Sequence, residues 1–222
     1  MDWFPLWLSL RVATLATVFA AIVGVGLAYV LAKGTFRGRS LLEAVATVPI
    51  VLPPTVLGYY LLVVLGVRTP IGRAWESVFG GPLVFTSTAA VAAATVSAIP
   101  FVLRTSRAAL EAVDQRFEQA ARTMGLPEWR VALHVSLPLA RRGLLAGVAL
   151  GFARALGDFG VTVMLAGNIP GRTQTMPIAV YDAVQSGRDR TASTLSGVLA
   201  VIAIVVLVAV NRLSTTTSAE RR

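Results

Sequence analysis

The sequence predicts an all-α, polytopic integral membrane protein with about five transmembrane helices and one long loop. Of its 222 residues, 55% are hydrophobic and only 14% are charged, whereas soluble domains usually contain about 25% charged residues. Five apolar stretches are long enough for a helix to cross the bilayer core, which takes about 20 residues. They cover residues 12–32, 44–67, 83–103, 143–167 and 191–211. Because backbone polar groups in hydrocarbon need internal partners, helices are the expected spanning elements.

Four of the five stretches contain no charged residue, and the fourth is the exception. The chain begins Met1-Asp2-Trp3-Phe4-Pro5, without the basic n-region and small-residue cleavage site of a secretory signal peptide. We therefore expect the first stretch to remain in the protein as a span. Residues 1–222 are expected to form a single transmembrane domain.

Prolines interrupt the second stretch at Pro49, Pro53 and Pro54. A proline inside a helix removes a backbone hydrogen bond and clashes with the preceding turn, so it breaks or kinks the helix. Broken helices at membrane depth are tolerated where they are buried in protein or line a cavity. Pro53 and Pro54 are therefore candidates for a pore or gate, and a kinked packing helix is the alternative.

The fourth stretch contains two charged residues, Arg154 and Asp158. They are four residues apart, so they share one face of a helix, and Arg154 lies roughly 16 Å from the start of the stretch, near mid-bilayer. A charge there costs about 2.5–3.5 kcal/mol on insertion scales and normally faces the bundle interior or a pathway. We expect a pathway or gate position in which Arg154 helps an anion across. A mutually neutralised structural pair is the alternative.

The distribution of basic residues predicts the orientation. The first loop, the third loop and the C-terminal tail contain thirteen Lys and Arg residues, and the opposite side contains six. The positive-inside rule places the first group in the cytoplasm and the N-terminus outside. Lys33, Arg37 and Arg39 are interpreted as topology signals only. Because the basic residues form short clusters between apolar runs, the net charge of +9 does not indicate a nucleic-acid partner. The absence of cysteine and the single His134 exclude disulfides and multi-histidine metal sites.

The third loop, residues 104–142, is longer than a connection between two antiparallel helices requires. Residues 110–113 and 117–124 have the pattern of short amphipathic helices. Gly125 fits a helix C-terminus, where glycine accepts the left-handed conformation, and Pro127 fits the first turn of another helix. The loop is thus predicted to contain two short helices with a glycine hinge between them. An amphipathic helix on the membrane surface is the alternative.

The pattern Ala120-Ala121-x3-Gly125-x9-Val135-x-Leu137-Pro138 resembles the EAA signature of binding-protein-dependent ABC importer permeases. The resemblance implies the type I ABC importer permease fold in the bacterial plasma membrane. In that family this loop forms the coupling helix, which docks in a groove of a cytoplasmic ATPase. The acidic position before the alanine pair is Gln119 here, and Glu118 lies one residue earlier. This departure leaves open which carboxylate, if any, contacts the ATPase.

Shape is the expected basis of this coupling. The small alanines allow close approach, the glycine turns the chain, and Glu118 and Arg122 have the spacing of an i,i+4 ion pair. The residues expected to couple the chain to the ATPase are Glu118, Gln119, Ala120, Ala121, Arg122, Gly125, Leu137 and Pro138.

Three further segments resemble molybdate permeases, which implies molybdate, or tungstate, as cargo. They are residues 52–59 (LPPTVLGY), 153–160 (ARALGDFG) and 168–181 (NIPGRTQTMPIAVY). Asp158 stands where many relatives have glutamate. Sulfate and thiosulfate permeases have similar motifs and are the alternative within the class. The resemblance also implies a homodimer in the lipid membrane, two cytoplasmic ABC ATPase subunits and an extracytoplasmic oxyanion-binding protein.

The chain itself is not expected to be an enzyme or to bind a cofactor. It contains no G-x-x-x-x-G-K-[ST] segment to hold nucleotide phosphates, so ATP and Mg²⁺ would be used by the partner ATPase. A secondary transporter, independent of ATP, is the alternative from another class. Such transporters usually show inverted repeats and ion-coupling carboxylates at the midplane, whereas Asp158 is the only acid within a predicted span.

The external loop after the fourth stretch contains Arg172, Thr173 and Thr175. Hydroxyls and an arginine can hydrogen-bond a tetrahedral oxyanion, so these residues are candidates for anion contact. The alternative is an ordinary external turn that touches the binding protein. We favour the turn, because the resemblance implies that selectivity comes chiefly from that separate protein.

Overall fold

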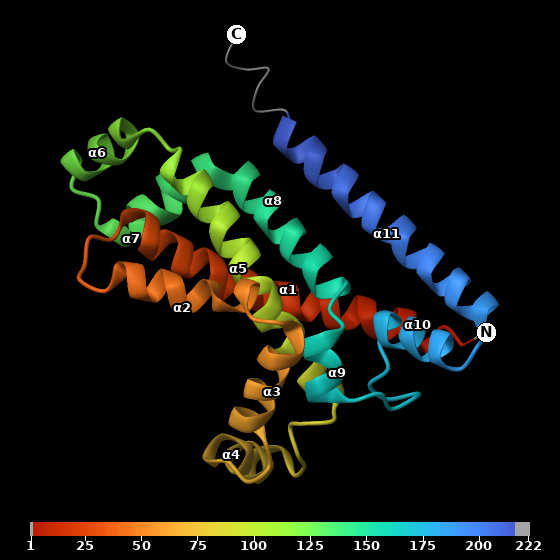
Figure 1. Cartoon of the computed structure of the whole chain (residues 1–222). Helices are drawn as coiled ribbons and strands as arrows, with labels where there is room; N and C mark the ends of the chain where they lie inside the picture. The colour runs from red at the N-terminus through yellow and green to blue at the C-terminus, as the bar shows by residue number, and fades with distance from the viewer. Residues whose placement is uncertain (1, 216–222) are drawn as a thin grey trace.

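The computed structural model describes the backbone of residues 2–215 and the side chains of residues 2–208. These residues form helices and connecting turns without a strand, which confirms the predicted all-α class. Figure 1 shows their arrangement. The elements are α1 (Phe4–Lys33), α2 (Arg39–Val51), α3 (Pro54–Leu65), α4 (Pro70–Phe79), α5 (Ser87–Glu111), α6 (Gln115–Thr123), α7 (Glu128–Val131), the π-helical turn η1 (Ala132–Ser136), α8 (Leu137–Leu156), α9 (Gly160–Ala166), α10 (Met176–Gln185) and α11 (Asp189–Thr215).

Four helical segments of the described chain are long and apolar enough to span a membrane. They are Phe4–Lys33, Ser87–Glu111, Glu128–Leu156 and Asp189–Val208. The bent pair of α2 and α3 makes a fifth span if the pair is counted as one. The number of spans therefore agrees with the sequence prediction, and the predicted basic tail residues Arg221 and Arg222 lie outside the described residues.

Two predicted spans are broken helices in the structure. The break that the prolines predicted in the second span, 44–67, is confirmed, whereas no break was predicted in the fourth, 143–167, so an unbroken helix there is wrong. The second consists of α2 and α3, which meet at an angle of 117°, because Pro54 occupies the first turn of α3 and cannot continue α2. The fourth ends with α8 at Leu156, and α9 begins at Gly160. Both breaks lie at residues that the sequence marked as special.

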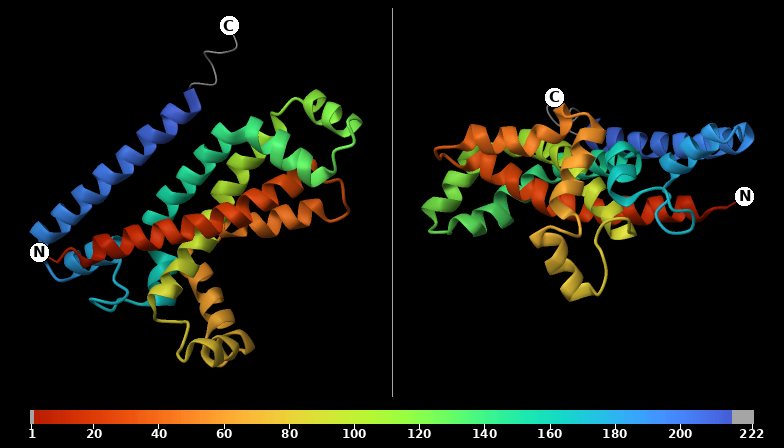
Figure 2. Two further views of the ribbon diagram at one scale, coloured as in Figure 1. Left: turned by 180° about the vertical axis from the view of Figure 1, so that it is seen from behind. Right: turned by 60° about the horizontal axis from the view of Figure 1, so that its bottom comes forward.

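The core is formed by α1, α5 and α8, which pack against one another, with α1 crossing the other two (Figures 1 and 2). Their shared surface consists mainly of alanine and glycine. A Cβ on Gly24 would lie 2.9 Å from Val102, and one on Gly143 would lie 2.4 Å from Ala109. Small residues let helix backbones approach closely, which is how spans associate in lipid.

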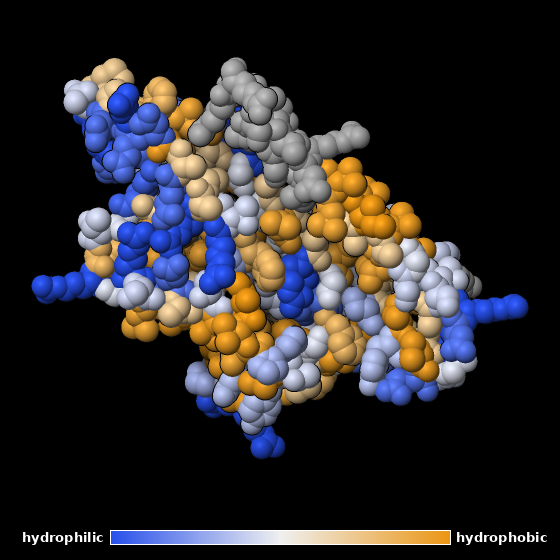
Figure 3. Space-filling view, turned by 45° about the horizontal axis from the view of Figure 1, so that its top comes forward, coloured by the Kyte–Doolittle hydropathy of each residue, from blue (hydrophilic) through white to orange (hydrophobic). Residues whose placement is uncertain are grey.

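Two parts project from this core. The α3–α4 arm leaves the bundle, and α3 packs on α9 (Figures 1 and 2). The last helix, α11, contacts α8 and α10 along one side. In the space-filling view, hydrophilic residues gather at the left, at the end that holds α6 and the start of α2, and hydrophobic residues cover much of the middle (Figure 3). We call the end with α6 and α7 the loop end, and the end with α4, α9 and α10 the opposite end.

Candidate coupling surface and translocation site

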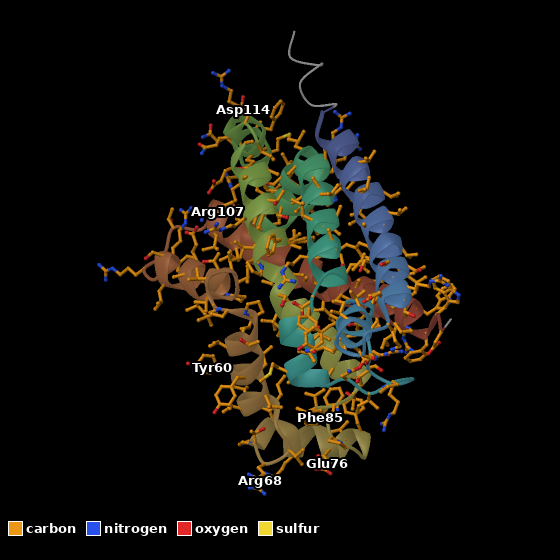
Figure 4. All side chains as sticks on the ribbon, turned by 45° about the vertical axis from the view of Figure 1, so that its right-hand side comes forward. Tyr60, Arg68, Glu76, Phe85, Arg107 and Asp114 are labelled. Carbon is orange, nitrogen blue, oxygen red and sulfur yellow. The ribbon has the colours of Figure 1, made fainter. Side chains whose placement is uncertain are left out.

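The loop between α5 and α8 is shorter than predicted, but it contains the predicted pair of short helices. Helix α5 continues to Glu111, so the helix predicted over 110–113 is its last turn. Asp114 caps α6 by accepting a hydrogen bond from the Arg116 backbone N–H at 2.9 Å; Figure 4 shows it at the loop end, far from Arg68. Gly125 then has φ = +79°, the left-handed conformation expected of a glycine after a helix C-terminus.

An exposed apolar stripe runs along α6. It consists of Phe117, Ala120 and Met124, spaced three and four residues apart on one face. The residues Phe117 and Met124 are 58% and 74% exposed. Ala121, the other member of the predicted alanine pair, is buried beneath them. We call Phe117, Ala120 and Met124 the coupling surface; Gln119 beside it is exposed as well.

Glu118 faces into the protein and away from the coupling surface. Only 2% of the residue is exposed. Its Oε1 lies 2.8 Å from the Lys33 Nζ at the end of α1 and accepts a hydrogen bond from the Ser136 Oγ at 2.7 Å. Lys33 therefore has a specific partner and is more than a topology signal. We call Lys33, Glu118 and Ser136 the clamp.

The predicted i,i+4 pair of Glu118 with Arg122 is wrong. Arg122 instead donates two hydrogen bonds to Glu128, at 2.7 and 3.1 Å, and so ties α6 to α7 across the glycine turn. The carboxylate of Glu128 raises the pKa of Arg122, chiefly through these hydrogen bonds. Pro127 precedes α7 as its N-cap. The predicted coupling residues Leu137 and Pro138 begin α8. Leu137 packs on the cluster around Leu110, and Pro138 is exposed.

A second ion network closes the loop end. Arg107 of α5 donates to Glu111 at 2.7 Å and pairs with Glu43 of α2, and Arg39 lies 3.5 Å from Glu111. These pairs are partly exposed, and such pairs contribute little to stability individually. Together they fix where α2 begins relative to α5.

The predicted charged pair lies at the break between α8 and α9. The Arg154 Nη2 lies 2.9 Å from the Asp158 Oδ1, which also accepts a hydrogen bond from the Ser97 Oγ at 3.0 Å. The other carboxylate oxygen accepts from the Thr162 backbone N–H at 3.0 Å and from its hydroxyl at 2.6 Å. Asp158 is 3% exposed, and a buried charge is unfavourable unless it is paired and hydrogen-bonded. Here one cation and three further donors compensate it.

The two helix breaks meet at one cavity of about 280 Å³. Arg154 and Asp158 line it from the α8–α9 side, and Pro54 and Thr55 line it from the start of α3. The Arg154 side chain is 26% exposed, so part of the guanidinium faces this space. The structure thus brings together Pro54, Arg154 and Asp158 of the predicted pathway set, whereas Pro53 is the exposed residue before α3 and does not line the cavity.

Close packing at Gly160 holds the two breaks together. A Cβ on this residue would lie 2.7 Å from the Cβ of Pro54. We expect Gly160→Ala to lower the free energy of unfolding by about 1–3 kcal/mol, as overpacking does, measured as a lower thermal midpoint of the purified protein. Gly26→Ala is the matched control, because a Cβ there has nothing within 4 Å. Equal midpoints for the two variants would contradict this close contact.

The predicted anion-contacting hydroxyls of the loop before α10 are not available. Thr173 and Thr175 are buried. The Thr173 Oγ1 accepts a hydrogen bond from the Ile169 backbone N–H at 3.1 Å, and the Thr175 Oγ1 has no partner among the described residues. Arg172 alone of the three is exposed, on the rim of a cavity of about 640 Å³ that Arg11 also lines. The geometry agrees with a turn that the Thr173 hydroxyl holds together.

Comparison with known proteins identifies the family of the chain. Residues 13–216 match the family described as "Binding-protein-dependent transport system inner membrane component". The chain belongs to this family. The permease is accordingly a non-catalytic membrane subunit of the bacterial plasma membrane.

Named relatives of the permease include molybdenum and sulfate permeases. It is 42% identical over 207 residues to the "Molybdenum transport system permease protein ModB" of Escherichia coli (strain K12), over 93% of this chain and 90% of that protein. It is 43% identical to ModB of Haemophilus influenzae, over 81% of this chain and 78% of that protein. It is 32% identical to the "Sulfate transport system permease protein CysT" of E. coli K12, over 92% of this chain and 74% of that protein.

Solved ABC importers have the same fold. An inward-facing structure of the MetNI methionine ABC transporter superposes with a TM-score of 0.73 at 19% identity, over 96% of this chain and 95% of that chain. A bacterial ABC transporter for the import of alginate gives a TM-score of 0.73 at 13% identity, over 96% of this chain and 78% of that chain. At these identities the likeness concerns the fold, and it confirms the predicted type I ABC importer permease architecture.

Sequence reasoning missed two features of the permease. The exposed face of Phe117 and Met124 was not predicted, although their spacing of seven residues, with Ala120 at i+3, is typical of one helix face. The role of Lys33 in the clamp had no local signal, because 85 residues separate it from Glu118.

Proposed function

We propose that this permease moves molybdate, and tungstate, into the cell as the membrane subunit of an ATP-driven importer. The observation that supports this cargo is the 42% identity to ModB over nearly the full length of both chains. The sulfate permease CysT is 32% identical, which makes sulfate or thiosulfate the second candidate. Because Thr173 and Thr175 are buried, they give no reason to expect that this chain selects between these anions. Discrimination between them would belong to a separate binding protein.

The proposed assembly is a homodimer of the permease with two cytoplasmic ABC ATPase subunits and an extracytoplasmic oxyanion-binding protein. The loop end would face the cytoplasm and the N-terminus would lie outside, in keeping with the thirteen to six distribution of basic residues. ATP and Mg²⁺ would bind to the ATPase subunits.

The exposed apolar stripe on α6 lies at a hydrophilic end of the protein. Such apolar patches mark interaction sites, so a partner is expected to cover it.

The coupling surface is the proposed contact with the ATPase. Phe117 and Met124 would insert into its groove, and Ala120 between them would allow the two backbones to come close. Gln119 and Arg122 would contribute polar contacts at the rim. Glu118 would act indirectly, because its carboxylate is already held by Lys33 and Ser136.

The cavity at the two helix breaks is the proposed pathway or gate. Discontinuous helices are the usual way in which membrane transporters expose backbone and charge near the midplane. An arginine that is partly exposed in such a cavity suits an anionic cargo. The ion pair with Asp158 fixes the guanidinium while leaving the side that faces the cavity accessible.

Reconstitution tests this proposal directly. The permease would be co-purified with its ATPase and its binding protein and placed in liposomes. ATP-dependent uptake of molybdate and tungstate, with little uptake of sulfate, is the expected result. Uptake of sulfate alone would establish the second candidate, and uptake without ATP would favour a secondary transporter. Calorimetric titration of the binding protein with the three anions would give its selectivity independently.

A further inference from the structure

We propose that Lys33 is a positioning residue for the coupling surface. Its ion pair with Glu118 fastens α6 to the end of α1, so that α1 moves with the coupling loop and transmits that motion to the outer end of the permease. This inference rests on the proposed coupling of the loop to an ATPase. It assigns a role in that coupling to a residue that lies outside the loop and outside the EAA-like segment.

Three separate parts of the chain meet at one carboxylate oxygen. Lys33 is the last residue of α1, Glu118 lies in the first turns of α6, and Ser136 closes the π-helical turn before α8. Both the lysine ammonium, at 2.8 Å, and the serine hydroxyl, at 2.7 Å, approach the Glu118 Oε1. The clamp is therefore the point at which the coupling helix is attached to the helical bundle.

Burial makes this attachment stronger than the other ion pairs of the loop. The side chains of Lys33 and Glu118 are 15% and 3% exposed, whereas those of Arg122 and Glu128 are 39% and 64% exposed. In an exposed ion pair, water can solvate both charged groups when they separate, so the pair contributes little to stability. Breaking a buried pair leaves one charge uncompensated in a poorly solvated place, which is strongly unfavourable. The lysine is also well placed at a helix C-terminus, where a cation is stabilised by the helix dipole.

Helix α1 contains one of the clamp residues and runs unbroken from the clamp to the opposite end. Its 30 residues form a single helix, about 45 Å long at 1.5 Å per residue. By contrast α8, which also begins at the loop, is preceded by the π-helical turn and ends at the break beside Asp158. A displacement of the loop is therefore transmitted with less local bending through α1 than through α8.

The far end of α1 is attached as specifically as the near end. The Ser9 Oγ accepts a hydrogen bond from the Met176 backbone N–H at 2.7 Å, and Ser9 is buried. Met176 is the first residue of α10 and follows the loop that contains Arg172. In the proposed orientation this loop faces the binding protein. Helix α1 thus joins the ATPase side to the binding-protein side through one buried polar contact at each end.

The test compares Lys33→Met with Arg37→Met in the reconstituted importer. Arg37 is an exposed basic residue four positions further on, with no partner among the described residues. The readout is the stimulation of ATP hydrolysis by loaded binding protein added outside. We expect Lys33→Met to reduce this stimulation at least about fivefold, the lower end of usual coupling effects, with basal hydrolysis unchanged. Arg37→Met should behave as wild type, and Lys33→Arg should retain most of the stimulation.

Hydrogen exchange supplies a readout that does not depend on transport. Amides of residues 115–123 should exchange faster in Lys33→Met than in Arg37→Met, because α6 is no longer fastened. Unchanged exchange and full stimulation in Lys33→Met would overturn the proposal. If wild type itself showed no ATP-driven uptake, the proposed function would be wrong, and the exchange measurement would still decide whether the clamp holds α6.

A double variant covers the case in which Lys33→Met fails to assemble. Lys33→Met combined with Glu118→Met removes both charges, and an apolar pair of similar size often restores stability. We expect this variant to assemble and still to lack the stimulation, since the specific attachment is gone. Wild-type stimulation in the double variant would show that the ion pair has no positioning role.

Discussion

Replacing Arg154 with glutamine is expected to reduce molybdate uptake by about tenfold or more while the importer still assembles. Hydrogen bonds to charged groups contribute about 1.5–3 kcal/mol, and about 1.4 kcal/mol corresponds to a factor of ten. Assembly should survive because Asp158 keeps the donors of Ser97 and Thr162. Uptake would be measured as ATP-dependent accumulation of labelled molybdate in liposomes, and assembly by co-purification of the subunits.

Two further variants test whether uptake depends on the positive charge in the cavity or on any arginine of the protein. Arg68→Gln removes an exposed arginine on the α3–α4 side, at the bottom of Figure 4, and should leave uptake unchanged. Arg154→Lys keeps the positive charge but loses the planar donor array, so an intermediate rate is expected. Normal uptake in Arg154→Gln at normal subunit levels would show that Arg154 and Asp158 form a structural pair without a role in the pathway.

The sequence predicted most of the architecture because membrane insertion imposes simple rules. Apolar length identified the spans, and the prolines predicted the break between α2 and α3. The charged pair was predicted on one face of a helix, and the break between Arg154 and Asp158 was not predicted. The sequence could not give the consequence of these breaks. The prolines do not give the size of the bend between α2 and α3, which is 117°. The close approach of Gly160 to Pro54 joins segments more than 100 residues apart.

The loop shows where local rules reach their limit. Its two helices and the left-handed Gly125 follow from turn chemistry, and both were predicted. The partners of its charged residues were not predicted, because the i,i+4 spacing favoured a pair of Glu118 with Arg122. The buried side of α6 explains the difference. Glu118 lies on that side, where Lys33 and Ser136 contact it. Arg122 lies on the exposed side, where Glu128 is available. Which face of α6 is buried depends on α1, and the loop sequence has no information about that helix.

The two faces of α6 differ in the structure. One face exposes Phe117, Ala120 and Met124, and the other is attached through Glu118 to α1. In the proposed coupling, the exposed face would meet the ATPase by its shape, and the nearby carboxylate of Glu118 would act inside the protein. A glutamine at the usual acidic position, Gln119, is compatible with that proposal.

Replacing Gly125 with valine is expected to uncouple ATP hydrolysis from uptake. Gly125 has φ = +79°, a conformation in which a β-branched residue is strained by about 1–3 kcal/mol. A Cβ there has nothing within 4 Å, so the substitution causes no steric clash and acts through the backbone alone. Relief of this strain requires a different turn between α6 and α7, which would move the coupling surface relative to the clamp. The measurement is the amount of molybdate taken up per ATP hydrolysed, which should fall several-fold while hydrolysis continues.

Gly38→Val is the matched control for this prediction. Gly38 has φ = +97° and equally open surroundings, and it lies at the same end of the protein in the turn between α1 and α2. Both variants should lose similar stability, since the backbone strain is alike, but only Gly125→Val changes the position of α6. If Gly125→Val kept the wild-type ratio of uptake to hydrolysis, the ATPase would dock at a different surface, because a displaced α6 cannot transmit the same motion.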